Sequence, residues 1–225
     1  MTGPSLDLLT GPAQPAVSVR RVRPADGPEL AAFYAALSPE SRRARFLGYS
    51  TGIDEEMSHS FCRPDHMHAE GFVARLPGTA GEEGPLVGHL CLEPAGPRRS
   101  ELAVAVADDQ QHRGIGRALF EAALAWAEAH GQQAILASAF ADNGRVLRLL
   151  SSAPHPCRIL PADGGVVDVI VPLVLELPRD LTVVAPLRRR RRRLAGTLRP
   201  RCHAVWRRRP PPAPAAGGSA SKESS

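Results

Sequence analysis

The sequence lacks the features that mark several common classes of protein. It has no run of 18 apolar residues, so we expect no membrane-spanning helix. The N-terminus lacks the basic and then apolar pattern of a signal peptide. The four cysteines show no metal-binding or redox spacing and are predicted to be free thiols, which suggests a cytoplasmic protein. The usual nucleotide-binding loops, G-x-x-x-x-G-K-[ST] and G-x-G-x-x-G, are also absent.

Acidic residues are scarce at one end of the chain. Residues 188–225 contain twelve Lys or Arg and one acidic residue, whereas the preceding 187 residues contain twenty-two acidic residues and sixteen Arg. We therefore predict a flexible N-terminus at 1–16, one folded domain at 17–177 and a disordered basic tail at 178–225. The run Arg188–Arg193 can contact nucleic acid or an anionic surface weakly by charge alone, or it is a solvated extension without a role.

Apolar and alternating segments predict a sheet, and amphipathic segments between them predict helices. The predicted strands cover residues 17–22, 71–76, 86–93, 101–107, 134–140, 157–160 and 166–174. The predicted helices cover residues 27–37, 40–47 and 143–150, together with a long helix that begins near Ile115. The shorter helices are expected to be capped by Asp26 (with Glu29), Ser38 and Asp142. The predicted fold class is α/β, with one mixed central sheet of about seven strands flanked by about four helices.

The stretch from residue 101 to residue 131 organises this fold. An apolar strand leads into a polar turn, then into Gly114 and Gly116, and then into the long helix. The first N–H groups of a helix have no intrahelical partner, and the helix dipole favours negative charge there. Glycine lets a phosphate approach the backbone without a Cβ atom in the way. The pattern therefore predicts a phosphate-binding turn, and the alternative is an ordinary strand-to-helix turn.

The spacing Gln111-x-x-Gly114-x-Gly116 resembles the [Q/R]-x-x-G-x-[G/A] loop of the GNAT (Gcn5-related) N-acetyltransferase family. The resemblance implies a single GNAT acyltransferase domain, with acetyl-CoA as cosubstrate and its diphosphate on this loop. It also implies that the strand before the loop parts from its neighbour and offers backbone groups to the pantetheine. The later D-N-x-x-x-L-x-x-L resembles a family motif whose asparagine contacts the cosubstrate, unless it only starts the helix. The residues thus assigned to acetyl-CoA are Val104, Val106, Gln111, His112, Arg113, Gly114, Ile115, Gly116, Arg117 and Asn143.

The segment L-S-P-E-S-R-R-A-R-F, Leu37–Phe46, is similar to the L-S-P-E-S-x-x-x-R-F stretch of the bacterial protein-lysine acetyltransferase branch of this family. There the segment forms two short helices beside the acceptor site. The resemblance therefore implies a lysine side chain as the acceptor. The alternative is a capped helical hairpin with an arginine-rich face.

Glu101 stands where the family places its general base, at the start of the strand before the loop. An amine acceptor is protonated at neutral pH, and a carboxylate in the cleft can take its proton directly or through water. The alternative is a solvated carboxylate at a strand end. No tyrosine follows Tyr49, so the family's usual general acid is missing, with His155 as a substitute or water in its place. The segment Ser151–Pro156 also replaces the K-x-G-F turn that usually follows the last motif.

Residues 53–70 contain His59, Cys62, His66 and His68 among several acidic residues. The spacing H-x₂-C-x₃-H-x-H is not a usual zinc pattern. We therefore expect no metal site and interpret this segment as a loop that lines the acceptor cleft.

Three functions fit these patterns. The first is an acetyl-CoA-dependent N-acetyltransferase acting on protein lysines. The second is the same chemistry on a small amine or a protein N-terminus. The third is an inactive, CoA-binding domain whose tail tethers it to nucleic acid or a membrane. The segment L-S-P-E-S favours the first over the second, and the presence of Glu101 favours the first two over the third. The missing tyrosine and the altered turn favour the third.

Overall fold

A seven-stranded mixed sheet forms the centre of the protein. The computed structural model describes residues 17–48, 53, 55–79, 82–161 and 164–176. The strand order is β1-β2-β3-β4-β5-β7-β6, and every neighbouring pair is antiparallel except β4 and β5, which are parallel. The strands are β1 Ser18–Arg21, β2 Glu70–Arg75, β3 Leu86–Pro94, β4 Arg99–Val106, β5 Ala134–Phe140, β6 Arg158–Ile159 and β7 Val166–Pro172. The predicted mixed sheet of about seven strands is confirmed.

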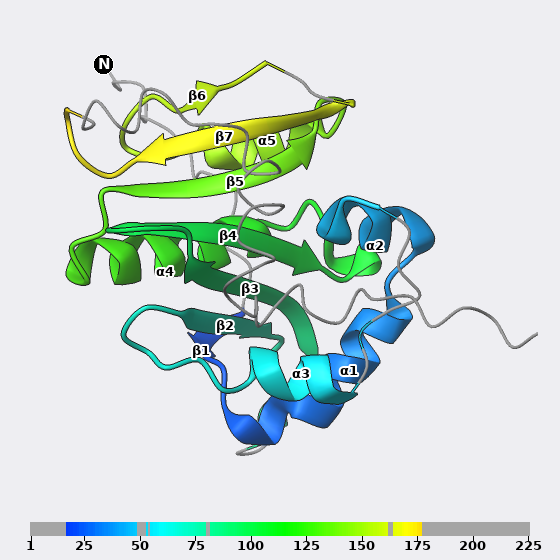
Figure 1. The fold of residues 1–225 in the computed structure, drawn as a ribbon. Helices are drawn as coiled ribbons and strands as arrows, with labels where there is room; N and C mark the ends of the chain where they lie inside the picture. Colours follow the sequence, from blue (N-terminus) through cyan, green and yellow to red (C-terminus); the bar gives the residue numbers. More distant parts are fainter. Residues whose placement is uncertain (1–16, 49–52, 54, 80–81, 162–163, 177–225) are drawn as a thin grey trace, which may run out of the picture.

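Helices cover both faces of this sheet (Figure 1). They are α1 Gly27–Ala36, α2 Pro39–Phe46, α3 Glu55–Phe61, α4 Ile115–Ala129 and α5 Gly144–Leu150, with 3-10 turns η1 Pro24–Asp26 and η2 Asp108–Gln110. The long helix α4 packs on one face, and α1 and α3 pack on the other. No helix in the described parts of the chain is long and apolar enough to cross a membrane. The expected flexible N-terminus and basic tail, with Arg188–Arg193, lie outside the described residues.

The alternation of side chains along β4 separates two apolar cores. Leu102, Val104 and Val106 pack toward α4, whereas Ala103 and Ala105 pack toward α1 and α3. The apolar face predicted for α4 is buried: its residues Ile115, Leu119, Ala123, Trp126 and Ala127 are at most 4% exposed. Because α4 is fixed on β2, β3 and β4, the turn that precedes it is held at the end of β4.

β4 and β5 pair over only a short length before they separate. Their parallel ladder joins residues 99–101 to residues 134–136, although β4 continues to Val106 and β5 continues to Phe140. The predicted parting of Val104 and Val106 from the next strand is therefore confirmed. The separation leaves a gap inside the sheet that is open at the end where both strands stop.

One segment is folded differently from its predicted structure. Residues 53–70 were expected to be a loop, but the structure has α3 at Glu55–Phe61. Met57, Phe61 and Cys62 are buried against α1 and the sheet. The apolar spacing of this short helix is interrupted by polar residues, which is why periodicity did not reveal it.

Of the three predicted helix caps, Ser38 is confirmed, Asp142 is wrong, and Asp26 occupies the N-cap position without a cap hydrogen bond. Asp26 precedes α1 but makes no cap hydrogen bond there. Asp142 does not cap α5, because Asn143 does so by accepting a hydrogen bond from Val146 N at 3.2 Å. Ser38 caps α2 as predicted and accepts a hydrogen bond from Ser41 N at 3.1 Å.

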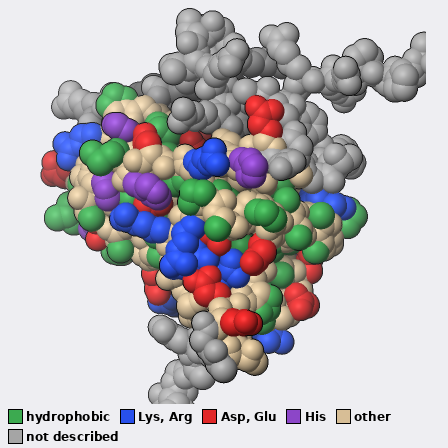
Figure 2. All heavy atoms as spheres, turned by 90° about the horizontal axis from the view of Figure 1, so that it is seen from below, with side chains coloured by type: hydrophobic (Ala, Val, Ile, Leu, Met, Phe, Trp, Pro, Cys, Tyr) green, Lys and Arg blue, Asp and Glu red, His purple; other side chains and the backbone are tan. Residues whose placement is uncertain are grey.

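Asp26 instead joins β1 to β2 through arginine. Its carboxylate accepts hydrogen bonds from Arg20 at 2.8 Å and from Arg75 Nη2 at 3.0 Å, and from the Arg23 amide at 2.7 Å. Glu29 accepts from Arg75 Nη1 at 2.8 Å, so the expected capping-box pair serves an ion cluster. Basic and acidic side chains also lie next to each other on the face shown in Figure 2. Burial acts to raise the pKa of Asp26, but these hydrogen bonds outweigh it and lower the pKa to about 2.

We expect Asp26→Asn to lower the free energy of unfolding by about 2–3 kcal/mol at pH 7, because Arg75 would lose a buried partner. The lowered pKa means that the wild-type contribution is complete above about pH 4 and is lost as the pH falls toward 2. Urea unfolding at several pH values measures both effects. The control Glu121→Gln breaks an exposed ion pair with Arg117 and should cost no more than about 0.5 kcal/mol. Equal losses in the two variants would contradict the assignment.

Candidate functional site

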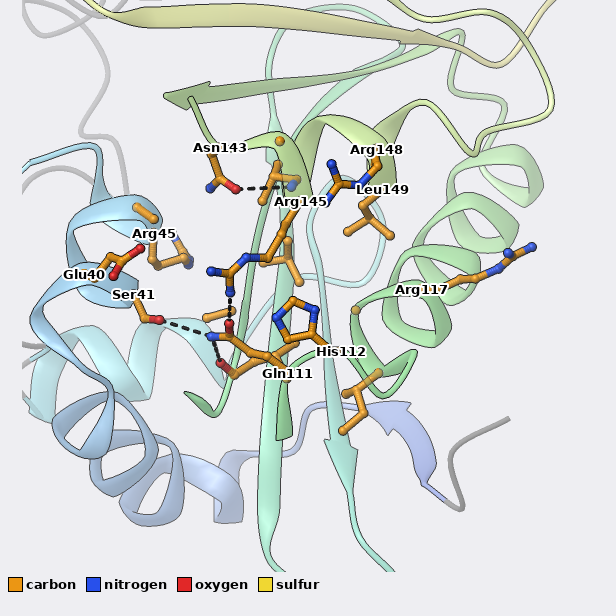
Figure 3. Close-up of a pocket in the computed structure, with 18 of the residues that line it drawn as sticks. Glu40, Ser41, Arg45, Gln111, His112, Arg117, Asn143, Arg145, Arg148 and Leu149 are labelled. Carbon is orange, nitrogen blue, oxygen red and sulfur yellow. Dashed lines mark hydrogen bonds between the residues drawn. The ribbon is translucent and has the colours of Figure 1, made fainter. Parts of the chain in front are cut away.

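A pocket of about 620 Å³ lies where β4 and β5 separate. Its walls are α2 on one side, α5 on the other, and the turn between β4 and α4 at one end (Figure 3). Every residue that the sequence assigned to acetyl-CoA lines this pocket except Arg113. The structure thus brings together residues from β4, the turn, α4 and the start of α5.

The turn directs backbone N–H groups into the pocket. His112 and Gly114 have positive φ angles of 65° and 81°, which reverse the chain just before α4 begins. The first intrahelical hydrogen bond runs from Ala118 N to Gly114 O at 3.0 Å. The preceding amides, of Ile115, Gly116 and Arg117, therefore have the geometry of free helix N-terminal donors. Such a group of donors favours an anion.

Gln111 connects the turn to β4, α2 and α5. Its amide nitrogen donates to Val106 O and to Ser41 Oγ of α2, each at 3.2 Å. Its amide oxygen accepts a short hydrogen bond from Arg145 of α5. Figure 3 shows Arg145 extended from α5 toward Gln111. Gln111 is therefore a structural link as well as a lining residue.

Positive charge predominates on the described walls. The basic lining residues are Arg43, Arg45, Arg117, Arg145 and Arg148, and the acidic ones are Glu40 and Asp142. Arg148 folds back along α5 to within 3.2 Å of where a Cβ atom of residue 144 would lie. Arg117 pairs with Glu121 at 2.8 Å, and in Figure 3 it points away from the other labelled residues. The potential of the pocket thus suits a polyanion.

The gap between the strands continues the pocket inward. A smaller cavity of about 40 Å³ adjoins it and is lined by residues of β4 and β5, among them Leu102, Ala103 and Ser138. Ala107 N, just after the end of β4, donates to Val87 O of β3 at 2.9 Å, so the backbone groups of Ala107 point toward β3. Because the backbone groups of an antiparallel strand alternate in direction, those of Val104 and Val106 face the gap. An extended ligand with amide groups can lie along them as a strand would.

Glu101 lies at the closed end of the gap. It is the last residue of β4 that pairs with β5, and its side chain is half-buried. It does not line the large pocket, but its neighbour Leu102 lines the small cavity. Along an extended strand, Glu101 is about 10 Å from Val104. Its side chain lies on the α1 side of the sheet, which it shares with Ala103 and Ala105.

Several lining residues were not found from the sequence. Ser41, Arg43 and Arg45 come from α2, and Arg145 and Arg148 come from α5. Only Ser41 with Arg45 and Arg145 with Arg148 have a spacing that shares a helix face, and this spacing does not specify a partner. Asn143 lines the pocket but also caps α5, so both of its expected functions are compatible with its position.

The histidine-rich segment does not form a metal centre within the described residues. His66 Nδ1 is 2.9 Å from Glu70 Oε1, and His68 Nδ1 is 3.2 Å from Asp65 Oδ2, so these histidines form separate pairs. Cys62 is buried in the core beside α1, and burial raises the pKa of its thiol to about 11. A thiol with this pKa is a poor metal ligand at neutral pH.

A family model described as the acetyltransferase (GNAT) family matches residues 32–152. No sequence among the curated proteins matches the chain.

Solved structures share the fold. The GNAT domain of PAT from S. lividans is 25% identical, with a TM-score of 0.58 over 68% of this chain and 88% of that chain. The putative acetyltransferase yncA from Salmonella typhimurium, solved with acetyl-CoA, is 16% identical, with a TM-score of 0.57 over 72% and 97%. The ribosomal-protein-alanine N-acetyltransferase from Brucella melitensis is 21% identical, with a TM-score of 0.54 over 68% and 98%.

We expect Gly114→Asp to weaken the binding of acetyl-CoA at least about a hundredfold. The new carboxylate would repel a diphosphate. A residue with a Cβ atom would also be strained at position 114, where φ is 81°. Isothermal titration calorimetry measures the affinity. The control Gly131→Asp introduces the same side chain at a φ of 62°, at the far end of α4. Unchanged binding by the first variant, or equal losses in both, would show that the turn is not the binding site.

Proposed function

The chain belongs to the GNAT acetyltransferase family, and from this premise we propose that it transfers the acetyl group of acetyl-CoA to a lysine side chain of a protein. Acetyl-CoA is the cosubstrate of the family, so the chain is an acetyl-CoA-dependent N-acetyltransferase. The observation that carries the assignment of the site is the pocket that joins the amide-rich turn to the gap between β4 and β5.

The pocket suits the parts of acetyl-CoA in order. The diphosphate is placed at the amides of residues 114–117, where the helix dipole and Arg145 add positive potential. Arg148 of the pocket lining adds further positive charge, and Arg113 belongs to the turn itself. The pantetheine amides are placed against the backbone of Val104 and Val106. The acetyl thioester is then placed in the gap, near the small cavity between the strands.

Glu101 is proposed as the general base. It stands at the closed end of the gap, where an acceptor nitrogen would meet the thioester carbonyl. Glu101 is about 10 Å along the strand from Val104, against which the pantetheine is proposed to lie. This separation favours proton transfer from the amine to Glu101 through a water molecule. The deprotonated amine then attacks the carbonyl directly, so the protein needs no nucleophilic side chain. Backbone N–H groups at the gap are suited to stabilise the negative charge that develops on the carbonyl oxygen.

No tyrosine lines the pocket within the described residues, so none is placed to protonate the leaving thiolate. Tyr34 is fully buried, and its hydroxyl lies 2.9 Å from His89 Nδ1 and accepts from Arg45 at 3.1 Å. We therefore propose that the thiolate leaves without a tyrosine acid, which its low basicity allows.

The lysine acceptor is proposed from α2. This helix carries the L-S-P-E-S segment and forms one wall of the pocket, and the fold resembles that of PAT from S. lividans. Glu40 of this wall offers a negative charge to an incoming ammonium group.

We expect Glu101→Gln to lower kcat about a hundredfold while the affinity for acetyl-CoA changes less than about twofold, because only proton transfer is removed. Glu93 is directly opposite Glu101 on β3, so Glu93→Gln is a matched control with the same loss of charge. Steady-state kinetics and calorimetry measure the two quantities. Equal loss of turnover in both variants would contradict the base assignment.

Incubation with radiolabelled acetyl-CoA distinguishes the acceptor classes. We expect label on lysine side chains of a protein panel and little on peptides with only a free N-terminus or on small amines. Label confined to the latter groups would replace the lysine proposal by one of the other two acceptors. No label on any acceptor, with acetyl-CoA still bound, would support an inactive binding domain.

A further inference from the structure

Asp108 is held by the helix that forms one wall of the pocket. Its Oδ2 atom accepts a hydrogen bond from Ser38 N at 2.8 Å. Its Oδ1 atom accepts from Ser38 Oγ at 2.8 Å and from Ser41 Oγ at 2.6 Å. Burial acts to raise the pKa of Asp108, but these hydrogen bonds outweigh it and the pKa lies below its ordinary value. The carboxylate is thus charged at the N-terminus of α2, where the helix dipole favours it.

The same residue belongs to the turn that is placed under the diphosphate. Asp108 begins η2, which leads through Gln111 into the amide-rich turn before α4. Gln111 Nε2 also donates to Ser41 Oγ at 3.2 Å, so two residues of the turn contact one serine of α2. Because Ser41 lines the pocket, these contacts connect the turn at one end of the pocket to the wall formed by α2.

The other end of α2 is fixed to the core. Arg45 donates to Tyr34 OH at 3.1 Å and to Cys91 Sγ at 3.3 Å. Its guanidinium carbon lies 5.1 Å from the ring centre of Phe46 and 5.5 Å from that of Phe61. Arg43, in the middle of α2, contacts the ring of Phe140. Among the described residues, the hydrogen bonds between the N-terminal end of α2 and the turn all involve Ser38 or Ser41.

From these contacts we propose that Asp108 is a positioning residue that couples the cosubstrate turn to α2. Occupation of the turn then stabilises the orientation of the wall beside which the acceptor binds. The proposal rests on the proposed acetyl-CoA site. It also gives a function to Ser38 and Ser41 of the L-S-P-E-S segment, because both serines donate hydrogen bonds to Asp108.

The variant Asp108→Asn keeps the shape of the side chain but turns an NH₂ group toward a donor, either the Ser38 amide or the serine hydroxyls. The variant Asp109→Asn is the matched control, because it removes the neighbouring charge, and the Asp109 carboxylate accepts from Gln110 Nε2 at 2.9 Å and not from α2. The variant Ser41→Ala removes the partner in α2 while Ser38 still caps the helix. It remains informative if Asp108→Asn is poorly folded.

Amide hydrogen exchange with and without coenzyme A tests the coupling in the full chain. In the wild type and in Asp109→Asn, we expect coenzyme A to slow exchange about tenfold both in residues 111–117 and in residues 39–46. In Asp108→Asn and Ser41→Ala, we expect the slowing to remain in residues 111–117 and to fall below about twofold in residues 39–46. A merely structural role would speed exchange in α2 equally with and without coenzyme A.

The failure of this inference differs from the failure of the proposed function. If residues 39–46 are still protected by coenzyme A in Asp108→Asn, or lose protection equally in Asp109→Asn, Asp108 does not couple the two elements. If coenzyme A protects neither segment in the wild type, the cosubstrate site itself is wrong and the coupling is overturned with it.

Discussion

The separation of β4 from β5 is the constraint on which the site depends. β4 and β5 pair only between residues 99–101 and residues 134–136. Both strands continue beyond this point without pairing with each other, so a gap separates them. α4 fixes the outer end of β4 through a fully apolar face, and the antiparallel ladder with β7 fixes β5. A single strand, β4, therefore positions three parts of the site. It carries Glu101 at the closed end of the gap, it provides backbone groups along the gap, and it leads into the amide-rich turn.

The wall formed by α2 is a separate element that has to be held against this gap. Arg45 anchors it to the aromatic core around Tyr34, whose hydroxyl also meets His89. Burial lowers the pKa of His89 to about 3, so the histidine is neutral and the positive charge beside the ring cluster belongs to arginine. Arg43 adds a contact to β5, with its guanidinium carbon 3.8 Å from the ring centre of Phe140. The wall is thus attached to the aromatic core and, through Phe140, to β5, one of the two strands that border the gap.

Much of the fold could be predicted because apolar periodicity and turn residues, which are local features of the sequence, determine most of its strands and helices. The apolar run of β4 and the glycine spacing after it indicated the strand, the turn and α4, and the bounds of β5 were predicted to the residue. What was missed depends on contacts distant in sequence. Arg75 meets Asp26 across 49 positions and Ser41 meets Asp108 across 67, and no periodicity carries such information. Asp26 and Asn143 show the same limit, since either residue type can cap a helix or serve another partner.

The gap has a further consequence for the behaviour of the protein before it meets its ligand. Residues 102–106 and 137–140 present two strand edges in the middle of a sheet, with no strand between them among the described residues. Exposed edges are templates for pairing with other extended chains, and β-sheet proteins usually protect them. Here residues of α2 and α5 line the small cavity between the two edges, together with residues of β4 and β5. An extended ligand with its own amides, bound as proposed, would fill this interruption of the sheet as a strand does and would leave fewer backbone groups exposed for pairing with another chain.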